Sequence, residues 1–167
     1  QTNDRLIRER FGFILRNSIR NERIDDDGSS GFGPLHIAFA VTEVSSSAKA
    51  GDFFTAVELG QSLYKEYNCR ITYLPLDKWY QLAGIDVLIA MRDDFDPLKI
   101  EGSEPHLIKV AWLRNWFERW CNYERLSLFD IVFTSSELSA KYIQDKLKLP
   151  VRVQRIATNI RRFTHKS

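Results

Sequence analysis

The fold is decided by one run of seven residues, Leu35-His36-Ile37-Ala38-Phe39-Ala40-Val41, in which only the histidine is polar. A strand of a parallel sheet has this composition, because helices cover both faces of such a sheet and bury both sets of side chains. Polar and small residues follow over 42–51, and apolar residues then recur at helical spacing over 52–67. Since a buried strand, a loop and a helix begin a βαβ unit, this run predicts an α/β fold.

The same alternation continues to the end of the chain. Further apolar runs and the segments between them predict strands over 70–74, 85–91, 107–112, 129–133 and 151–156, and helices over 52–67, 77–82, 114–125 and 136–147. Asp52 is the expected N-cap of the first of these helices, and Ser135 or Ser136 of the last. This spacing predicts a Rossmann-like, three-layer α/β domain with a parallel sheet of about six strands.

The chain ahead of the first strand has a different character. Residues 4–20 alternate arginines with apolar residues near helical spacing, which predicts an extra N-terminal helix, and the polar, glycine-rich residues that follow predict a linker. We therefore expect an N-terminal helix and linker over 1–34, a Rossmann-like domain over 35–163, and the start of an interdomain linker or tail over 164–167. Because the chain begins with Gln1 instead of Met, we also expect a fragment or a processed form.

Composition limits the kinds of protein this chain can be. Its 167 residues suit one domain, and 44% apolar with 28% charged residues is typical of a globular protein. A net charge of +2 gives no basic field for nucleic acid, and no apolar run is long enough to span a membrane. Two cysteines, Cys69 and Cys121, make neither a disulfide framework nor a zinc site. We expect reduced core thiols and a cytoplasmic location, with attachment to the inner face of the membrane left open as an alternative.

In sheets of this kind a ligand binds at the carboxyl ends of the strands, at the point where the strand order reverses. This rule favours five segments as ligand contacts: 42–52, 91–96, 112–116, 134–137 and 157–159. In the first of them, Gly51 and Asp52 open a helix whose N–H groups are suited to an anion, although no dinucleotide-binding or P-loop motif is present. His36 and His106 come at strand starts, so no catalytic base can be named.

Two carboxylates follow the third predicted strand in Asp94-Phe95-Asp96. This Asp-x-Asp pattern is the one that holds a metal ion and a sugar nucleotide in A-type glycosyltransferases, and hard divalent cations prefer such oxygen ligands. The simpler interpretation is a turn, because Pro97 follows and Arg92 partly neutralises the carboxylates. We expect no metal site here.

Three of the four tryptophans lie between Trp112 and Trp120, at positions i, i+4 and i+8. If the segment is helical throughout, the rings share one stripe. The stripe is then either a face packed on the sheet or an aromatic platform for a sugar ring. Arg114 and Asn115, just beyond the fourth predicted strand, suit a ligand site, because a guanidinium pairs with phosphate or carboxylate and an amide bonds to hydroxyls.

Taken in order, these segments resemble the N-terminal domain of bacterial GT-B type glycosyltransferases, the class with two Rossmann-like domains. The segments that carry the resemblance are 37–41 with 51–59, 109–116, 129–137, and 157–159 with Phe163. The run over 109–116, Lys-Val-Ala-Trp-Leu-Arg-Asn-Trp, resembles enzymes of the group that includes spore-maturation-like glycosyltransferases.

The resemblance implies an acceptor-binding domain of a polysaccharide-building enzyme that transfers a sugar from a nucleotide-sugar donor to a glycan, lipid-linked or protein acceptor. It implies a donor-binding domain in the same polypeptide, no cofactor besides the nucleotide sugar, and no activity of this chain alone. The residues expected to bind substrate are Gly51, Asp52, Trp112, Arg114, Asn115, Trp116, Ser135, Ser136 and Asn159. Many retaining relatives carry a histidine near the fourth strand, where this chain has Arg114-Asn115, so the catalytic residue stays unassigned.

Two other functions remain open from the residues alone. One is an A-type, metal-dependent glycosyltransferase that uses Asp94 and Asp96. The other is a non-enzymatic Rossmann-like module that binds a partner protein or glycan through the tryptophan stripe.

Overall fold

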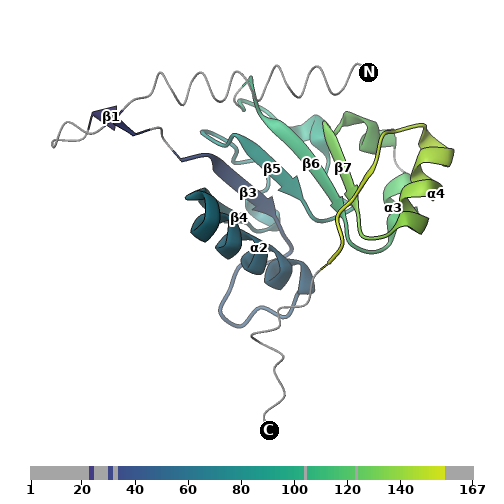
Figure 1. Cartoon of the computed structure of the whole chain (residues 1–167), viewed down its shortest axis with the longest axis horizontal. Helices are drawn as coiled ribbons and strands as arrows, with labels where there is room; N and C mark the ends of the chain where they lie inside the picture. The colour runs from purple at the N-terminus through teal and green to yellow at the C-terminus, as the bar shows by residue number, and fades with distance from the viewer. Residues whose placement is uncertain (1–22, 25–29, 32–33, 104, 123, 157–167) are drawn as a thin grey trace, which may run out of the picture.

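A computed structural model of the chain describes residues 23–24, 30–31, 34–103, 105–122 and 124–156. Its centre is a six-stranded sheet in which every neighbouring pair of strands is parallel, in the order β4-β3-β5-β6-β7-β8 (Figure 1). The strands are β3 (His36–Ala40), β4 (Arg70–Leu74), β5 (Val87–Ala90), β6 (Ile108–Leu113), β7 (Ile131–Thr134) and β8 (Arg152–Val153). This confirms the predicted α/β fold with a parallel sheet of six strands.

Helical segments connect successive strands. They are α2 (Gly51–Tyr67), η1 (Leu76–Lys78), η2 (Pro97–Lys99), α3 (Phe117–Cys121), η3 (Glu124–Leu128) and α4 (Glu137–Leu147). Ser136 is the N-cap of α4, as predicted, and its hydroxyl accepts from the Ser139 N–H at 3.2 Å. The predicted helix over 52–67 is α2, but Asp52 is not its N-cap, because Ala50 occupies the cap position and Asp52 lies inside the first turn.

The segment after β6 differs most from expectation. The predicted helix over 114–125 is only the five-residue α3 followed by the 3₁₀ turn η3. β6 continues to Leu113, and Trp116 then adopts a left-handed conformation with φ of 53°, which an α-helix cannot contain. Similarly, the helix expected over 77–82 is the three-residue η1, and the strand expected over 151–156 has two residues.

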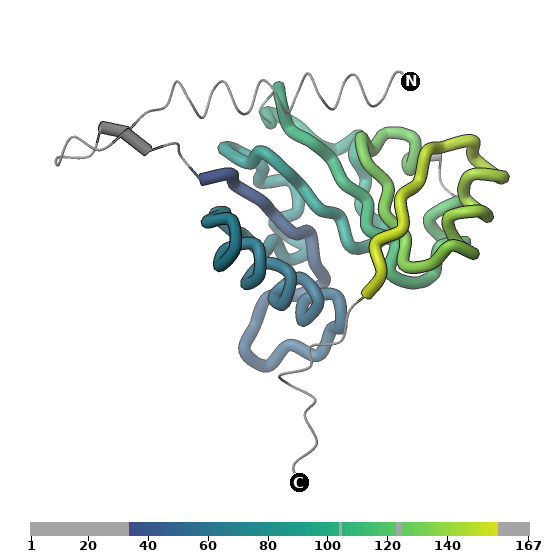
Figure 2. Tube along the Cα trace, in the orientation of Figure 1, coloured from purple at the N-terminus to yellow at the C-terminus, as the bar shows by residue number. Residues whose placement is uncertain are grey.

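The connections divide between the two faces of the sheet. On one face α2 packs over β3 and β4, with Ala56 beside Phe39 in one apolar cluster. On the other face lies the larger cluster, which joins Leu88 and Leu113 to Ile143 of α4. Figure 2 follows the chain through this arrangement, with α2 against β3 and β4, and α3 and α4 close together beside β7. The sheet therefore lies between two unequal helical layers.

Several expectations fall on residues outside the described ranges: the helix over 4–20, Asn159, and the tail over 164–167. Within the predicted linker, the backbone of β1 (Arg23–Ile24) pairs antiparallel with that of β2 (Ser30–Gly31). Both cysteines are free and buried, as predicted. No helix in the described part of the chain has the length and apolar character needed to span a bilayer.

Candidate functional site

The strand order reverses between β3 and β5. These strands are neighbours, but the chain leaves β3 toward β4 at one edge and leaves β5 toward β6 on the opposite side. The loops that follow them therefore meet at the carboxyl end of the sheet. A bond between the loops shows this directly, since Nη1 of Arg92 donates to Oγ1 of Thr42 at 2.9 Å. Such a reversal is where α/β sheets bind their ligands.

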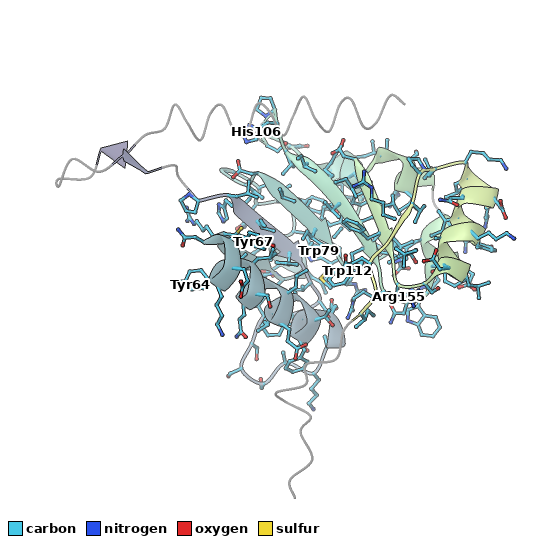
Figure 3. The ribbon with its side chains drawn as sticks, viewed as in Figure 1. Tyr64, Tyr67, Trp79, His106, Trp112 and Arg155 are labelled. Carbon is cyan, nitrogen blue, oxygen red and sulfur yellow. The ribbon has the colours of Figure 1, made fainter. Side chains whose placement is uncertain are left out.

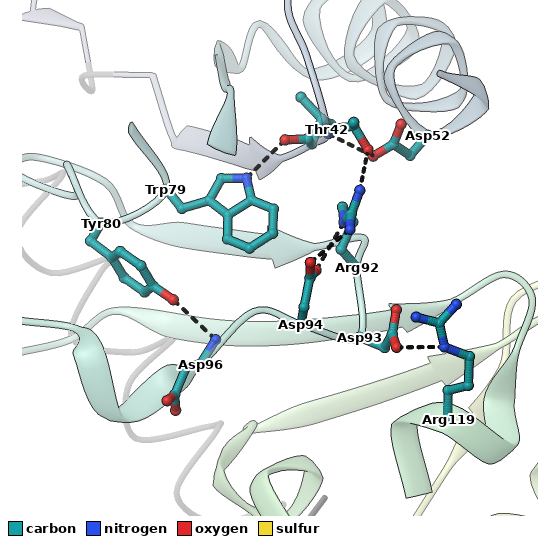
Figure 4. A network of polar contacts seen from close by, with 10 residues as sticks. Thr42, Asp52, Trp79, Tyr80, Arg92, Asp93, Asp94, Asp96 and Arg119 are labelled. Carbon is teal, nitrogen blue, oxygen red and sulfur yellow. Dashed lines mark hydrogen bonds and ion pairs between the residues drawn. The ribbon is translucent and has the colours of Figure 1, made fainter. Parts of the chain in front are cut away.

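A buried carboxylate organises this point. Asp52 is 6% exposed, and its Oδ2 accepts from both the N–H and the hydroxyl of Thr42 at 2.7 Å, while its Oδ1 accepts from the Phe53 N–H at 2.9 Å. Arg92 completes the network by bonding to Thr42 and to both carboxylate oxygens of Asp94 (Figure 4). Asp52 thus fixes the start of α2 against the end of β3.

Two aromatic residues of the β4–β5 connection, Trp79 and Tyr80, contact the residues of this network. The indole N–H of Trp79 donates to the Val41 carbonyl at 2.8 Å, and the guanidinium of Arg92 lies 5.9 Å from the centre of the Trp79 ring. The hydroxyl of Tyr80 accepts from the Asp96 N–H at 3.1 Å. Burial raises the pKa of Tyr80, which keeps this hydroxyl protonated.

The two carboxylates of the Asp-x-Asp pattern point to different partners. Asp94 forms a two-bond ion pair with Arg92, at 2.9 and 2.6 Å. Asp96 caps η2 by accepting from the Leu98 N–H and pairs with Arg125 at 3.3 Å. Across the described residues, no three His, Cys, Asp or Glu side chains gather as metal ligands. These contacts give both aspartates a role in holding loops.

In the loop before α2, two backbone N–H groups bind the carboxylate of Glu43. Oε1 of Glu43 accepts from the N–H of Lys49 at 2.6 Å and from the N–H of Ala50 at 2.8 Å. Backbone N–H groups arranged in this way form a small anion-binding nest. Sequence reasoning missed Glu43, and the only available signal was an acidic residue in a loop of small residues before a helix.

Arg114 connects the end of β6 to the start of α2. Its Nη1 donates to the Gly51 carbonyl at 3.1 Å and to the hydroxyl of Thr55 at 2.7 Å. Its Nε is buried and has no hydrogen-bond partner among the described residues. Burial lowers the pKa of this guanidinium, and the charge of Asp52 raises it in part. A positive charge is therefore held beside the first turn of α2 with one donor unused.

Trp112 has a second unused donor. This residue is 6% exposed, and its indole Nε1 is also buried without a partner in the described part of the chain. Trp112 packs in the apolar cluster that contains Ala56 of α2, and Arg114 bonds to the first turn of the same helix, so both side chains lie on the face of the sheet that carries α2. Each unsatisfied buried donor costs about 1–3 kcal/mol unless an oxygen from a ligand or a water satisfies it.

The three tryptophans do not form one stripe. Trp112 lies in β6, Trp116 is the N-cap of α3, and Trp120 is buried inside α3. Trp116 is the exception in exposure, because 62% of it is open to solvent. Its positive φ is rare and strained for a large side chain, and such strain clusters at functional sites. Asn115 beside it is also exposed.

The remaining predicted residues have structural partners. Oγ of Ser135 donates to the Arg114 carbonyl at 2.9 Å, which ties the end of β7 to the end of β6. Ser136 caps α4, as described above. His36 and His106 lie at strand starts, at the amino end of the sheet, and Figure 3 shows His106 and Trp112 at opposite ends of β6. The described carboxyl edge thus contains no histidine.

The fold is that of an α/β protein with a Rossmann-like parallel sheet, and the arginine-containing carboxyl edge near the reversal of strand order is its candidate site. Comparison of the chain with protein-family models, with curated proteins and with solved structures finds no match. The fold class therefore rests on the topology of the chain itself, and its function has to be argued from the site.

Proposed function

We propose that this chain is the acceptor-binding domain of a glycosyltransferase, which moves a sugar from a nucleotide-sugar donor to a glycan, lipid-linked or protein acceptor. In this proposal the carboxyl edge between α2 and α3 faces the donor phosphates and the acceptor substrate, and a second domain holds most of the nucleotide sugar. The observation that carries the proposal is the pair of buried N–H groups on Trp112 and Arg114 that lack a hydrogen-bond partner within the described residues.

The chemistry of a phosphorylated sugar fits these groups. Phosphate and hydroxyl oxygens accept hydrogen bonds, and charge-assisted bonds from a guanidinium are the stronger kind. Arg114 is held at one end by Gly51 and Thr55, so its Nε is fixed in place before a ligand arrives. An anion at Nε would also offset the cost of burying the positive charge, which lowers the pKa of Arg114 in the free protein.

Trp116 and Asn115 supply the other two elements of a sugar site. The exposed indole of Trp116 offers a flat apolar surface for the C–H face of a sugar ring, and the exposed amide of Asn115 can both donate to and accept from hydroxyls. Both residues directly follow Arg114. Sites of this kind combine an apolar wall with a few placed polar groups.

Asp52 serves this proposal as a positioning residue. Its carboxylate is occupied by Thr42 and Phe53, and it holds the first turn of α2 where Arg114 binds the Gly51 carbonyl. The catalytic group of the reaction is not assigned to any residue of this chain.

The two rival functions have weaker support. For the metal-dependent enzyme, Asp94 and Asp96 would have to release Arg92 and Arg125 before both could bind one ion. For the binding module, the tryptophan stripe would have to be a surface, but Trp112 and Trp120 are in the core. Neither rival accounts for the unused donor of Arg114.

The test is donor turnover. Release of nucleotide from a panel of nucleotide sugars is measured with the full polypeptide that carries this domain and with residues 1–167 alone, each with manganese and with EDTA. The proposal expects turnover by the full polypeptide in EDTA as well as in manganese, and none by residues 1–167. The variant Asp94→Asn, beside the exposed control Asp77→Asn, should keep most of the activity.

Two outcomes would contradict the proposal. Manganese-dependent turnover by residues 1–167, lost in Asp94→Asn and kept in Asp77→Asn, would assign the chemistry to the Asp-x-Asp pair. Absence of turnover with every donor, together with a partner protein bound through Trp116, would assign the chain to the binding modules.

A further inference from the structure

The face of the sheet that carries α2 is only half covered by described helices. α2 packs over β3 and β4 through Phe53, Ala56 and Leu59. Beside it, β5, β6 and β7 present a second apolar cluster on the same face. This cluster, called the open face below, consists of Leu35, Val87, Ile89, Ile108, Val110, Ile131 and Phe133. Ile108 and Val110 are buried, the others are partly exposed, and none of its members is in a described helix.

The topology explains why this half is left open. From β3 the chain steps to β4 at one edge, and every later connection runs in the opposite direction, toward β8. Crossovers between parallel strands are nearly always right-handed, so connections that travel in opposite directions lie on opposite faces. The connections after β4 pack in the larger cluster on the other face, as this rule requires. Within this chain, the segments left to cover the open face are those outside residues 36–153.

Two segments of this chain meet that condition, and their composition differs. Residues 157–167 contain two large apolar residues, Ile160 and Phe163. Residues 4–20 contain seven: Leu6, Ile7, Phe11, Phe13, Ile14, Leu15 and Ile19. Among these, Ile7, Phe11 and Ile14 follow the i, i+4, i+7 spacing of one helical face, and Arg16 and Arg20 fall on the opposite side. Such a pattern is typical of a helix that buries one face on a sheet.

The position of the segment also fits. β1 and β2 pair with Arg23 opposite Gly31, so the chain returns on itself just before Leu35, which packs in the open face. A helix over 4–20 would be about 25 Å long. Three adjacent strands span only about 10 Å. Because the segment is tethered next to the face, its effective concentration there is in the millimolar range, about that of other short flexible linkers.

We propose that residues 4–20 form an amphipathic helix that docks on the open face through Ile7, Phe11 and Ile14. The helix completes the layer that α2 begins, covers β5 to β7, and turns its arginines to solvent. The inference is independent of the proposed glycosyl transfer, because it concerns a different face of the sheet from the carboxyl edge.

The test is paramagnetic broadening in NMR: a nitroxide spin label is attached to residues 4–20, and the methyl signals of the sheet are recorded. Asn17→Cys lies away from the apolar stripe, and the native thiols Cys69 and Cys121 are buried with raised pKa values, so the label is directed to the new cysteine. In the full 167-residue chain, we expect the methyl signals of Ile89 and Val110 to broaden. The methyl signals of Ile143 and Leu126, in the cluster on the opposite face, should stay sharp.

A variant pair separates docking from folding. The double variant Phe11→Asp with Ile14→Asp should lose the broadening and lower the thermal midpoint, while the sheet keeps its dispersed methyl spectrum. Arg16→Asp, on the opposite side of the segment, should retain the broadening. Because both variants alter the segment and leave the sheet untouched, the sheet can fold in each.

Two results would overturn the proposal. The first is a folded sheet whose Ile89 and Val110 methyl signals stay sharp in the labelled chain. The second is broadening that appears only between molecules, when a spin-labelled chain is mixed with an isotopically labelled one. That result would make a second copy of the chain the occupant of the open face.

Discussion

The two ends of the sheet differ in whether all of their buried polar groups have hydrogen-bond partners. At the amino end, Asp86 and Asp130 each precede a strand and clamp the neighbouring one. Asp86 accepts from the His36 N–H at 2.8 Å, and Asp130 accepts from the Lys109 N–H at 2.8 Å, while their own N–H groups donate back to the carbonyls of the same residues. At the carboxyl end, buried donors of Trp112 and Arg114 have no partner within the described residues.

The side chains of the amino end are equally well paired. Nδ1 of His36 donates to the Gly84 carbonyl at 2.8 Å, and because a carbonyl can only accept, this nitrogen carries the proton. Nε2 of the neutral ring then accepts from the Thr72 hydroxyl, also at 2.8 Å. Nε2 of His106 donates to Asp86 at 2.8 Å. The paired polar groups of the amino end therefore stabilise the fold. The carboxyl end has buried donors without a partner among the described residues, which the oxygen atoms of a ligand can satisfy.

The largest expected effect is the loss of an aspartate clamp. Asp86→Ala removes the hydrogen-bond acceptor for the His36 N–H and for the His106 ring, and should lower the free energy of unfolding by about 2–3 kcal/mol. Asp86→Asn keeps one oxygen and should lose less. Urea denaturation measures both. Equal stability of wild type and Asp86→Ala would contradict a stabilising role of the polar contacts at the amino end.

The next effect concerns the carboxyl end. In the proposed transfer reaction, Arg114→Met should lower kcat/KM for the nucleotide-sugar donor about 10- to 100-fold, because a charge-assisted bond is lost. Its free energy of unfolding should change by less than about 1 kcal/mol, because a buried unpaired donor is lost together with the bonds to Gly51 and Thr55. Arg119→Met is the control, since that exposed arginine pairs with Asp93 and should leave both quantities nearly unchanged. A large loss of stability with normal activity would make Arg114 a structural residue.

A smaller effect of opposite sign is expected at Trp116. Replacing it with glycine relieves the left-handed backbone, and should raise the free energy of unfolding by about 0.5–1 kcal/mol. In the proposed transfer reaction, the same variant should weaken binding of the acceptor, measured as a higher KM. Trp116→Phe keeps an aromatic ring and the strain, so it should lie near wild type in stability. A destabilised glycine variant would show that Trp116 is there for packing.

The smallest effect is a pH dependence at the amino end. Burial lowers the pKa of His36 below its ordinary value of 6.5, so the unfolded chain binds more protons than the folded chain just below that pH. This histidine therefore contributes stability above pH 6.5 that is lost as the pH falls toward its folded pKa. Thermal midpoints at about pH 7 and about pH 5 should differ less in His36→Asn than in wild type. If the midpoints at the two pH values differ by the same amount in His36→Asn and in wild type, protonation of His36 is not coupled to unfolding.

The sequence contained most of the fold, because each buried strand is a short apolar run such as residues 36–40 or 108–113. The predicted helix over the tryptophan segment was wrong, because a spacing of four residues fits a helix as well as a strand that ends in a turn. Only the pairing of β6 with β7, which extends to Leu113, distinguishes the two structures. The clamps are visible afterwards in the similar runs Ile85-Asp86-Val87 and Phe129-Asp130-Ile131. The Glu43 nest and the unused donors depend on which segments meet in space, which one sequence does not reveal.

The distribution of the four tryptophans gives the protein its own optical reporter. The structure describes all four, of which Trp79, Trp112 and Trp120 are buried and Trp116 alone is largely exposed. Water-soluble quenchers such as iodide therefore act mainly on one indole, the one at the carboxyl edge. A ligand that covers Trp116 would shift the emission toward shorter wavelength and protect it from iodide. Events on the open face would leave this accessible component unchanged.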